Sequence, residues 1–224
     1  MTPPEPRDDA EARRAARPAA RPEVPRPWTL RTASAADVHD IAVFQTETWR
    51  EAYRDVVDPA YLAAVGVPER VASWGLRIAS PARHVVVARV RDAAPVTSGD
   101  DADDTPGDDA RGPSADDARG EVAGVVSWAH GDLRHDPFDL DLVELTTLYV
   151  GAVHRGSGLA DALLREALGD GAAYLWAFER NARALAFYAR HGFVADGTRK
   201  LDVPTGAWER RLVRPARPAP GGVG

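Results

Sequence analysis

The stretch from Glu144 to Leu164, ELTTLYVGAVHRGSGLADALL, constrains the fold of this chain more than any other. It begins with a β-prone apolar run and ends with leucines and alanines at helical spacing. The turn between them, Arg155-Gly156-Ser157-Gly158, contains two glycines. This succession predicts a buried strand that leads through a glycine turn into the N-terminus of a helix.

Such a turn is suited to an anion. Glycine has no Cβ, so a ligand can approach the backbone, and the first N–H groups of a helix have no intrahelical acceptor. The positive end of the helix and the donor fork of Arg155 both favour phosphate oxygens. The pattern alone is equally compatible with a turn that binds nothing, because glycine motifs also occur without a ligand.

Two nucleotide-binding interpretations of the turn are weakened by the residues around it. A Walker loop needs Gly-Lys-Ser/Thr, but Lys200 is the only lysine in the chain. A dinucleotide fold would place a third glycine where Asp161 stands, although Glu179 does mimic the acid that binds the ribose. An oxidoreductase would also need sequence for a second nucleotide half, which this chain lacks.

Two motifs resemble those of the GNAT-type N-acetyltransferases. Residues 155–160 (RGSGLA) match the Arg/Gln-x-x-Gly-x-Gly/Ala signature that holds the pyrophosphate of acetyl-coenzyme A in that family. Residues 181–193 (NARALAFYARHGF) are similar to its second acyl-CoA motif, in which an Asn opens a helix that carries Phe-Tyr and ends before Gly-Phe. The resemblance covers about residues 28–213 and is strongest over residues 144–193.

The resemblance implies an α/β (α+β) GNAT fold. Its twisted, mostly antiparallel mixed sheet has six to seven strands and helices on both faces, and its central parallel pair is splayed. The hydrophobic pattern predicts strands at 28–32, 84–90, 121–129, 145–150, 173–178, 193–194 and 208–213. The helix after the glycine turn is a crossover, so the strands on either side of it should be parallel. Ser34 and Asn181 are expected to cap helices.

Composition divides the chain into one domain and three extra segments. Residues 1–27 and 214–224 are Pro-rich tails, and residues 92–120 form an insertion with nine Asp and two Arg. We expect all three to be disordered, because they bury too little apolar surface to fold. The net charge of −6 comes from this insertion, so the single domain at 28–213 is close to neutral and nothing favours nucleic-acid binding.

Several classes of site and location are excluded or not expected. The chain has no cysteine, which excludes disulfides, thiolate metal sites and a cysteine nucleophile. His130 and His135 flank Asp132 and Asp136, but this spacing fits no metal-ligand template, so we expect no metal. Neither a membrane span nor a signal peptide is evident. We therefore expect a cytoplasmic protein, either a monomer or a homodimer.

The resemblance also implies catalytic roles for Glu144 and Tyr188. An acceptor amine is largely protonated at neutral pH, since lysine and N-terminal amines have pKa values of about 10.4 and about 8. Glu144, six residues before Val150, is the candidate base, and Tyr188 is the candidate acid for the departing coenzyme A thiolate. Alternatively, Glu144 binds substrate or ends the strand while ordered water is the base, and Tyr188 packs beside Phe187.

The remaining site residues follow from the same resemblance. Backbone groups of the central strand would bind the pantetheine arm as an added strand and polarise the thioester oxygen. Trp49 and Tyr53 share one helix face and either line the acceptor side or serve only burial. The implied cofactor-binding residues are Leu148, Tyr149, Val150, Arg155, Gly156, Ser157, Gly158, Leu159, Ala160 and Asn181.

The implied function is transfer of an acetyl group from acetyl-CoA to a primary amine by direct attack in a ternary complex. The acceptor would be an amine-bearing small molecule, a protein N-terminus or a lysine. The alternative is a non-catalytic acyl-CoA-binding module that acts as a sensor or assembly part. The presence of both Glu144 and Tyr188 favours the enzyme.

Overall fold

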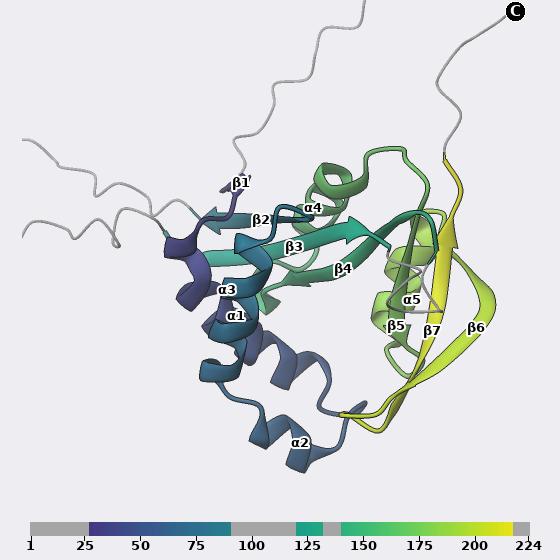
Figure 1. Ribbon diagram of the computed structural model, residues 1–224, viewed down its shortest axis with the longest axis horizontal. Helices are drawn as coiled ribbons and strands as arrows, with labels where there is room; N and C mark the ends of the chain where they lie inside the picture. Colours follow the sequence, from purple (N-terminus) through teal and green to yellow (C-terminus); the bar gives the residue numbers. More distant parts are fainter. Residues whose placement is uncertain (1–26, 91–119, 132–139, 217–224) are drawn as a thin grey trace, which may run out of the picture.

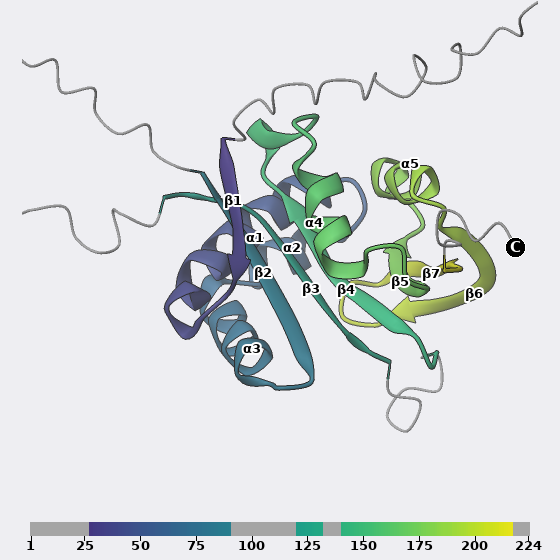
Figure 2. The same ribbon diagram turned by 90° about the horizontal axis from the view of Figure 1, so that it is seen from above.

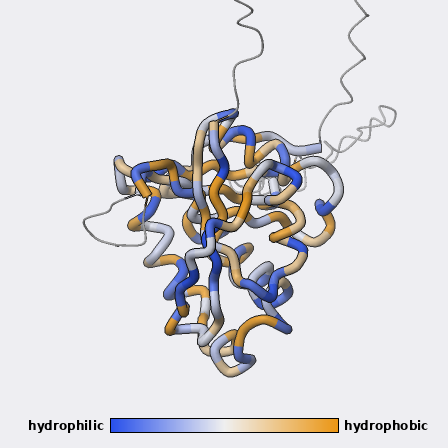
Figure 3. The backbone as a smooth tube through the Cα atoms, turned by 90° about the vertical axis from the view of Figure 1, so that its right-hand side faces the viewer, coloured by the Kyte–Doolittle hydropathy of each residue, from blue (hydrophilic) through white to orange (hydrophobic). Residues whose placement is uncertain are grey.

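A computed structural model describes residues 27–90, 120–131 and 140–216. Both expected tails and the acidic insertion lie almost wholly outside the described residues. No helix within the described ranges is long and apolar enough to cross a membrane. In keeping with this, hydrophobic and hydrophilic segments alternate along the chain (Figure 3).

The described residues form one seven-stranded sheet with the order β1-β2-β3-β4-β5-β7-β6 (Figure 1). Every neighbouring pair is antiparallel except β4 and β5, which are parallel. The predicted mixed sheet is therefore confirmed. The strands are β1 (Trp28–Thr32), β2 (Arg83–Val90), β3 (Val122–His130), β4 (Val143–Val150), β5 (Ala173–Phe178), β6 (Val194–Asp202) and β7 (Ala207–Arg214).

The parallel pair is splayed, as expected. Its ladder consists only of Val143 opposite Ala173 and Glu144 opposite Tyr174, after which the two strands separate. A register shift in the β3–β4 ladder leaves Thr146 as an extra residue in β4. Such a bulge bends a strand. The β5-facing edge of β4 beyond Glu144 is therefore open.

Helices cover both faces of the sheet (Figure 2). The sequence of β2 shows why, because Val85 and Val87 belong to the core on one face while Val86 and Ala88 belong to the core on the other. The first face packs against α1 and α3, and the second packs against α4 and α5. The helices are α1 (Val38–Ala52), α2 (Pro59–Ala64), α3 (Val67–Ala79), α4 (Leu159–Leu168) and α5 (Ala182–Arg190).

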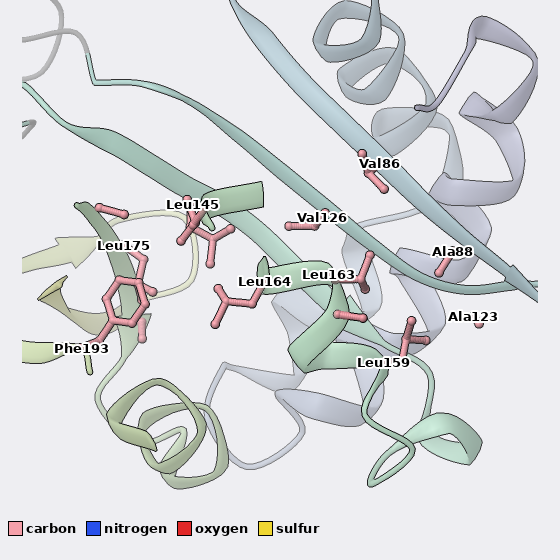
Figure 4. Packing of buried hydrophobic residues seen from close by; sticks show 14 of the residues in the cluster. Val86, Ala88, Ala123, Val126, Leu145, Leu159, Leu163, Leu164, Leu175 and Phe193 are labelled. Atoms are coloured by element: carbon pink, nitrogen blue, oxygen red, sulfur yellow. The ribbon is translucent and has the colours of Figure 1, made fainter. Parts of the chain in front are cut away.

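Helix α4 supplies the centre of the larger core. Leu159, Leu163 and Leu164 point from it toward the sheet and are almost completely buried (Figure 4). They recur at the spacing that places side chains on one face of a helix. This packing fixes the N-terminus of α4, and with it the glycine turn, against the open edge of β4.

The C-terminal hairpin differs in extent from the sequence prediction. Strand β6 runs from Val194 to Asp202, whereas the hydrophobic pattern indicated only residues 193–194. Most of its side chains are exposed, so no alternation of apolar residues marked it. The strand forms because β7 pairs with it along the far edge of the sheet.

The first helical turn contains a buried ionic cluster that sequence reasoning did not foresee. Ser34 begins a short 3-10 turn, η1 (Ala35–Asp37), that leads into α1, rather than capping α1 itself. Asp37 is fully buried and accepts hydrogen bonds from the Ser34 N–H (2.8 Å), from Arg31 and from Arg89 (2.8 Å). Burial alone would raise the pKa of Asp37, but these hydrogen bonds hold it well below its usual range.

Candidate active site

The glycine turn has the backbone shape that the sequence predicts. Gly156 and Gly158 have φ values of +79° and +83°, a region that side-chain-bearing residues rarely adopt. A Cβ built at either glycine would meet no atom within 4 Å, so the space above the turn is open. The first bond into α4 runs from the Ala162 N–H to the Gly158 oxygen (3.0 Å). The N–H groups of Arg155, Ser157 and Leu159 donate within the turn, so those of Gly156, Gly158 and Ala160 are the ones available to a ligand among the described hydrogen bonds.

Two predicted binding residues build the turn instead of lining the space beside it. The Ser157 hydroxyl donates to the His154 carbonyl (2.7 Å) and accepts from the Leu159 N–H (3.3 Å). The Leu159 side chain is fully buried in the core. Neither residue lines the cavity described below. Their contribution is to hold the turn in shape.

Arg155 lies at the turn but is paired with a residue of α1. Its guanidinium donates two hydrogen bonds to the Glu51 carboxylate, at 2.6 and 2.7 Å. These hydrogen bonds lower the pKa of Glu51. The sequence did not indicate this pairing, because the two residues are 104 positions apart. A phosphate at the turn would meet Arg155 and the Glu51 charge together.

A cavity of about 770 Å³ opens where β4 and β5 separate. Its volume is in the range typical of sites for small molecules and cofactors. The cavity reaches from the glycine turn, along β4, to α5 on one side and α1 on the other. It brings together most of the predicted site residues: Trp49, Tyr53, Leu148, Tyr149, Val150, Arg155, Gly156, Gly158, Ala160, Asn181 and Tyr188.

Helix α5 forms one wall of this cavity. As predicted, Asn181 caps the helix, and its side-chain oxygen accepts from the Ala184 N–H at 3.1 Å. Arg183 and Arg190 also line the cavity, although sequence reasoning did not single them out. Their spacing around Phe187, at i, i+4 and i+7, could have indicated that they share one helix face. With Arg155 they give the cavity three cationic side chains suited to an anionic ligand.

Tyr188 lines the cavity and also packs against aromatic neighbours. Its ring centroid is 5.3 Å from that of Phe187 and 5.7 Å from that of Phe193. Burial raises the pKa of Tyr188, and the nearby Tyr149 hydroxyl adds to the shift. The hydroxyl therefore keeps its proton at neutral pH and is available as a donor. The catalytic and packing interpretations are both compatible with this position.

An aromatic group lies at the opposite end of the cavity. The rings of Trp49 and Tyr53 are 4.8 Å apart, and that of Phe178 is 5.0 Å from Tyr53. The Trp49 indole donates to the Tyr149 hydroxyl at 2.8 Å. Trp49 and Tyr53 therefore line the cavity and also pack against a small core cluster.

The carboxylate that lines the cavity at this end is not the one that the sequence indicated. Glu144 lies opposite Tyr174 at the closed end of the splayed pair and is not a lining residue. Glu209 of β7 does line the cavity, as does Asp202. Burial, above all, raises the pKa of Glu209 to about 7. The sequence WERRLV gave no sign of this role, because its single acid lies among charged residues of an edge hairpin.

The histidine and aspartate loop supplies no metal site among the described residues. No group of three or more His, Asp or Glu within the described ranges could hold an ion. His130 lies 3.8 Å from Asp141. Asp132, His135 and Asp136 lie outside the described residues.

A mixed sheet with a splayed parallel pair, beside a glycine turn that begins a helix, is the arrangement that the resemblance to the GNAT fold implies. The sequence model of the family described as an acetyltransferase (GNAT) domain matches residues 114–195. This match and the fold shared with GNAT structures confirm the resemblance predicted from the two motifs.

Solved structures share the fold at low sequence identity. The PaiA N-acetyltransferase of Thermoplasma acidophilum in complex with coenzyme A is 15% identical, covers 82% of this chain and 97% of its own, and has a TM-score of 0.53. A histone acetyltransferase HPA2 and related acetyltransferase of Corynebacterium glutamicum is 24% identical, with 87% and 99% covered and a TM-score of 0.52. Arabidopsis thaliana NAA60 with a bisubstrate analogue is 16% identical, with 84% and 98% covered and a TM-score of 0.51. A search of curated proteins found no significant match.

Proposed function

We propose that this protein is an N-acetyltransferase that moves an acetyl group from acetyl-CoA directly to a primary amine in a ternary complex. The observation that carries the proposal is the continuity of one cavity. It joins a glycine turn with available N–H groups, the open edge of β4 and an aromatic, acidic end. A long anionic cofactor and an amine can therefore meet within it.

Two parts of the cavity would bind two parts of coenzyme A, its pyrophosphate and its pantetheine arm. The N–H groups at Gly156, Gly158 and Ala160 would bind the pyrophosphate, together with Arg155. The open space above the two glycines leaves room for it. The unpaired edge of β4 at residues 148–150 would bind the amide-containing pantetheine arm as an added strand. The similar Thermoplasma acidophilum structure was determined with coenzyme A, which supports this proposal.

Two proton transfers are required, and two different residues would perform them. Tyr188 keeps its proton and would donate it to the coenzyme A sulfur as the thiolate leaves. The proton of the amine would pass to a carboxylate, for which Glu144 is the candidate from the sequence, although it lies outside the cavity lining. N–H groups of β4 would polarise the thioester oxygen.

The acceptor would enter from the side of α1 and α2, where Trp49 and Tyr53 lie. The class of acceptor is an amine, either a small molecule or a protein N-terminus or lysine. The Arabidopsis thaliana NAA60 structure contains a bisubstrate analogue, and a chimeric spermidine N-acetyltransferase from Vibrio cholerae and hSSAT shares the fold at 17% identity with a TM-score of 0.51. Both are compatible with an amine acceptor.

A non-catalytic acyl-CoA-binding module is the second candidate. The position of Glu144 outside the cavity lining favours it, because an enzyme needs a proton acceptor within reach of the amine. Such a module would bind acetyl-CoA without releasing free thiol when amines are added. The enzyme would bind acetyl-CoA and would also release free thiol when amines are added.

The test combines a thermal shift with a thiol-release assay. Acetyl-CoA should raise the melting temperature at micromolar concentration, and a panel of primary amines should release free coenzyme A. Gly158→Asp should abolish the shift, since it places a negative charge at the pyrophosphate site and a side chain at φ +83°. Gly197→Asp, also at positive φ (+91°) but outside the cavity, is the matched control. A wild-type melting temperature unchanged by saturating acetyl-CoA would refute the proposal.

A further inference from the structure

One row of side chains on β5, β7 and β6 forms the acceptor end of the cavity. Phe178 of β5 lies opposite Glu209 of β7, and Glu209 lies opposite Lys200 of β6. Residues opposite each other in a ladder project to the same face of a sheet. Phe178 also contacts the Tyr53 ring at the end of α1, so this row faces the first helices. Glu209 is therefore a carboxylate on the side from which an acceptor would approach.

Glu209 differs from other carboxylates of the domain in having no hydrogen-bond donor among the described residues. Glu51, Glu179 and Asp196 each accept from an arginine, with shortest distances of 2.5 to 2.6 Å. No described residue donates a hydrogen bond to the Glu209 carboxylate or forms an ion pair with it. Its oxygens are thus available to a ligand inside the cavity. A partly buried carboxylate without a donor is unusual in a stable protein and indicates a functional position.

The charged groups around Glu209 come from three other parts of the chain. Lys200 and Asp202 of β6, Glu144 of β4 and the hydroxyl of Tyr53, the residue after α1, interact with it electrostatically. Burial is the main reason that its pKa rises to about 7, the Lys200 ammonium opposes this shift, and Asp202 and Glu144 add to it. A carboxylate of this kind is partly ionised at neutral pH and releases a captured proton readily.

We propose that the Glu209 carboxylate takes the proton from an ammonium-bearing acceptor in this cavity. This inference rests on the proposed acetyltransferase function. Glu144, the base predicted from the sequence, does not line the cavity, whereas Glu209 does. The acceptor class that fits is an alkylammonium, whose charge the carboxylates attract and whose carbon chain can lie on the rings of Trp49, Tyr53 and Phe178.

The proton balance of the reaction is as follows. The ammonium loses one proton to Glu209 and becomes a neutral amine. The amine nitrogen then bonds to the thioester carbonyl carbon, and the carbon–sulfur bond breaks as nitrogen loses its second proton. The sulfur receives one proton from Tyr188, which is replenished by the second one. The products are an amide, free coenzyme A and one proton that Glu209 returns to solvent.

The experiment measures thiol release at saturating acetyl-CoA with four probes: butylamine, tyramine, a peptide with a free N-terminus and a peptide with one lysine. Glu209→Gln should lower kcat by about 10²-fold for every probe that the wild-type protein acetylates. Its acetyl-CoA affinity, measured by calorimetry, should be unchanged. Glu209→Asp should restore part of kcat, because it returns a carboxylate to the same strand position.

The pH profile separates a base from a structural residue. For the wild-type protein, kcat/KM should rise with pH through an inflection near 7, and Glu209→Gln should lose this inflection. Lys200→Met removes a positive charge and should move the inflection to higher pH. Glu144→Gln removes a negative charge and should move it to lower pH. A residue that acts only through packing would not produce these opposite displacements.

Several outcomes would overturn the inference. Wild-type kcat and an unchanged inflection in Glu209→Gln would show that another group takes the proton while the proposed function stands. A raised KM with unchanged kcat would make Glu209 an amine-binding group only. Acetyl-CoA binding without acetylation of any probe by the wild-type protein would refute the proposed enzyme itself, and Glu209 as its base.

Discussion

Asp37 and Glu209 are two carboxylates of this protein whose surroundings shift their pKa values in opposite directions. Asp37, on the first helical turn, is fully buried and accepts hydrogen bonds from Ser34, Arg31 and Arg89, which keep it ionised. Glu209, at the acceptor end of the cavity, has no hydrogen-bond donor among the described residues, and burial raises its pKa to about 7. The number of donors, more than burial itself, decides whether a carboxylate serves structure or is free to exchange a proton.

The two carboxylates also lie in parts of the sheet that differ in strand pairing. The region around Asp37 belongs to the half of the sheet where β1, β2, β3 and β4 pair along their lengths. Glu209 lies beyond the point where β4 and β5 separate after two residue pairs. The open edge of β4 and the Glu209 carboxylate, to which no described residue donates, thus occur in the same part of the molecule. That part is the one that can accept a ligand.

The largest effect should come from the structural carboxylate. Asp37→Asn leaves Arg31 and Arg89 without their common buried partner and should destabilise the fold by ~3 kcal/mol, the lower end for a broken buried ion pair, since Asp40 still contacts Arg89. Chemical denaturation measures this loss. Asp40→Asn, at a half-exposed position of the same cluster, should cost less than about 1 kcal/mol. Equal losses in the two variants would contradict the central role of Asp37.

The same comparison predicts how acid affects stability. The folded pKa of Asp37 is lowered, so its contribution is complete above the unfolded value of about 4 and is lost as the pH falls through the folded value. Wild-type stability should therefore fall below about pH 4 more steeply than that of Asp37→Asn. Parallel curves for the two proteins would show that Asp37 is not the group responsible.

Tyr188→Phe should give the next largest effect, on turnover alone. It removes the hydroxyl and keeps the ring contacts with Phe187 and Phe193, so acetyl-CoA affinity should persist while kcat falls by about 10²-fold. Thiol release with an acetylated amine probe measures the loss. Tyr61→Phe, which removes a hydroxyl outside the cavity lining, is the control and should keep wild-type kcat. Full activity of Tyr188→Phe would reduce Tyr188 to a packing residue.

Arg155 combines both kinds of surroundings, because it is paired with Glu51 and also lines the cavity. Arg155→Ala should weaken acetyl-CoA binding by ~1.5–3 kcal/mol, the range for a hydrogen bond to a charged group. Glu51→Gln should strengthen it, because the guanidinium is then free for phosphate. Calorimetry measures both, and exposed Arg165→Ala is the matched control. Stronger binding by Arg155→Ala would show that the ion pair with Glu51 outweighs any phosphate contact.

The smallest effect concerns the stability cost of burying Glu209 without a donor from any of the residues that the structure describes. Its folded pKa is raised, so the folded state binds protons more tightly and stability falls as the pH rises from about 4.5 to about 7. Glu209→Gln should therefore stabilise the protein at pH 8 by on the order of 1 kcal/mol and have little effect at pH 4. Denaturation at both pH values tests this, with exposed Glu166→Gln as the control. Destabilisation at pH 8 would mean that Glu209 is paired.

The sequence by itself determined the elements whose signals are local. The apolar run before Gly151, the glycines at 156 and 158 and the helical spacing after them predicted the β4–turn–α4 unit correctly. The crossover helix made β4 and β5 parallel, and Asn181 marked the start of α5. Each of these signals depends on neighbours within one turn or one strand, where backbone preferences act directly.

Only the tertiary structure decided which charges are paired. Arg89 reaches Asp37 across 52 positions, and Arg155 reaches Glu51 across 104. Glu209 enters the cavity because β7 pairs with β5 in the register that places it opposite Phe178. Such meetings depend on strand register and helix packing, which bring together residues far apart in the chain and leave no periodic trace in the sequence. For the same reason the sequence could not show which glutamate lines the cavity. Glu144 lies at the closed end of the splayed pair, and Glu209 lies within the cavity.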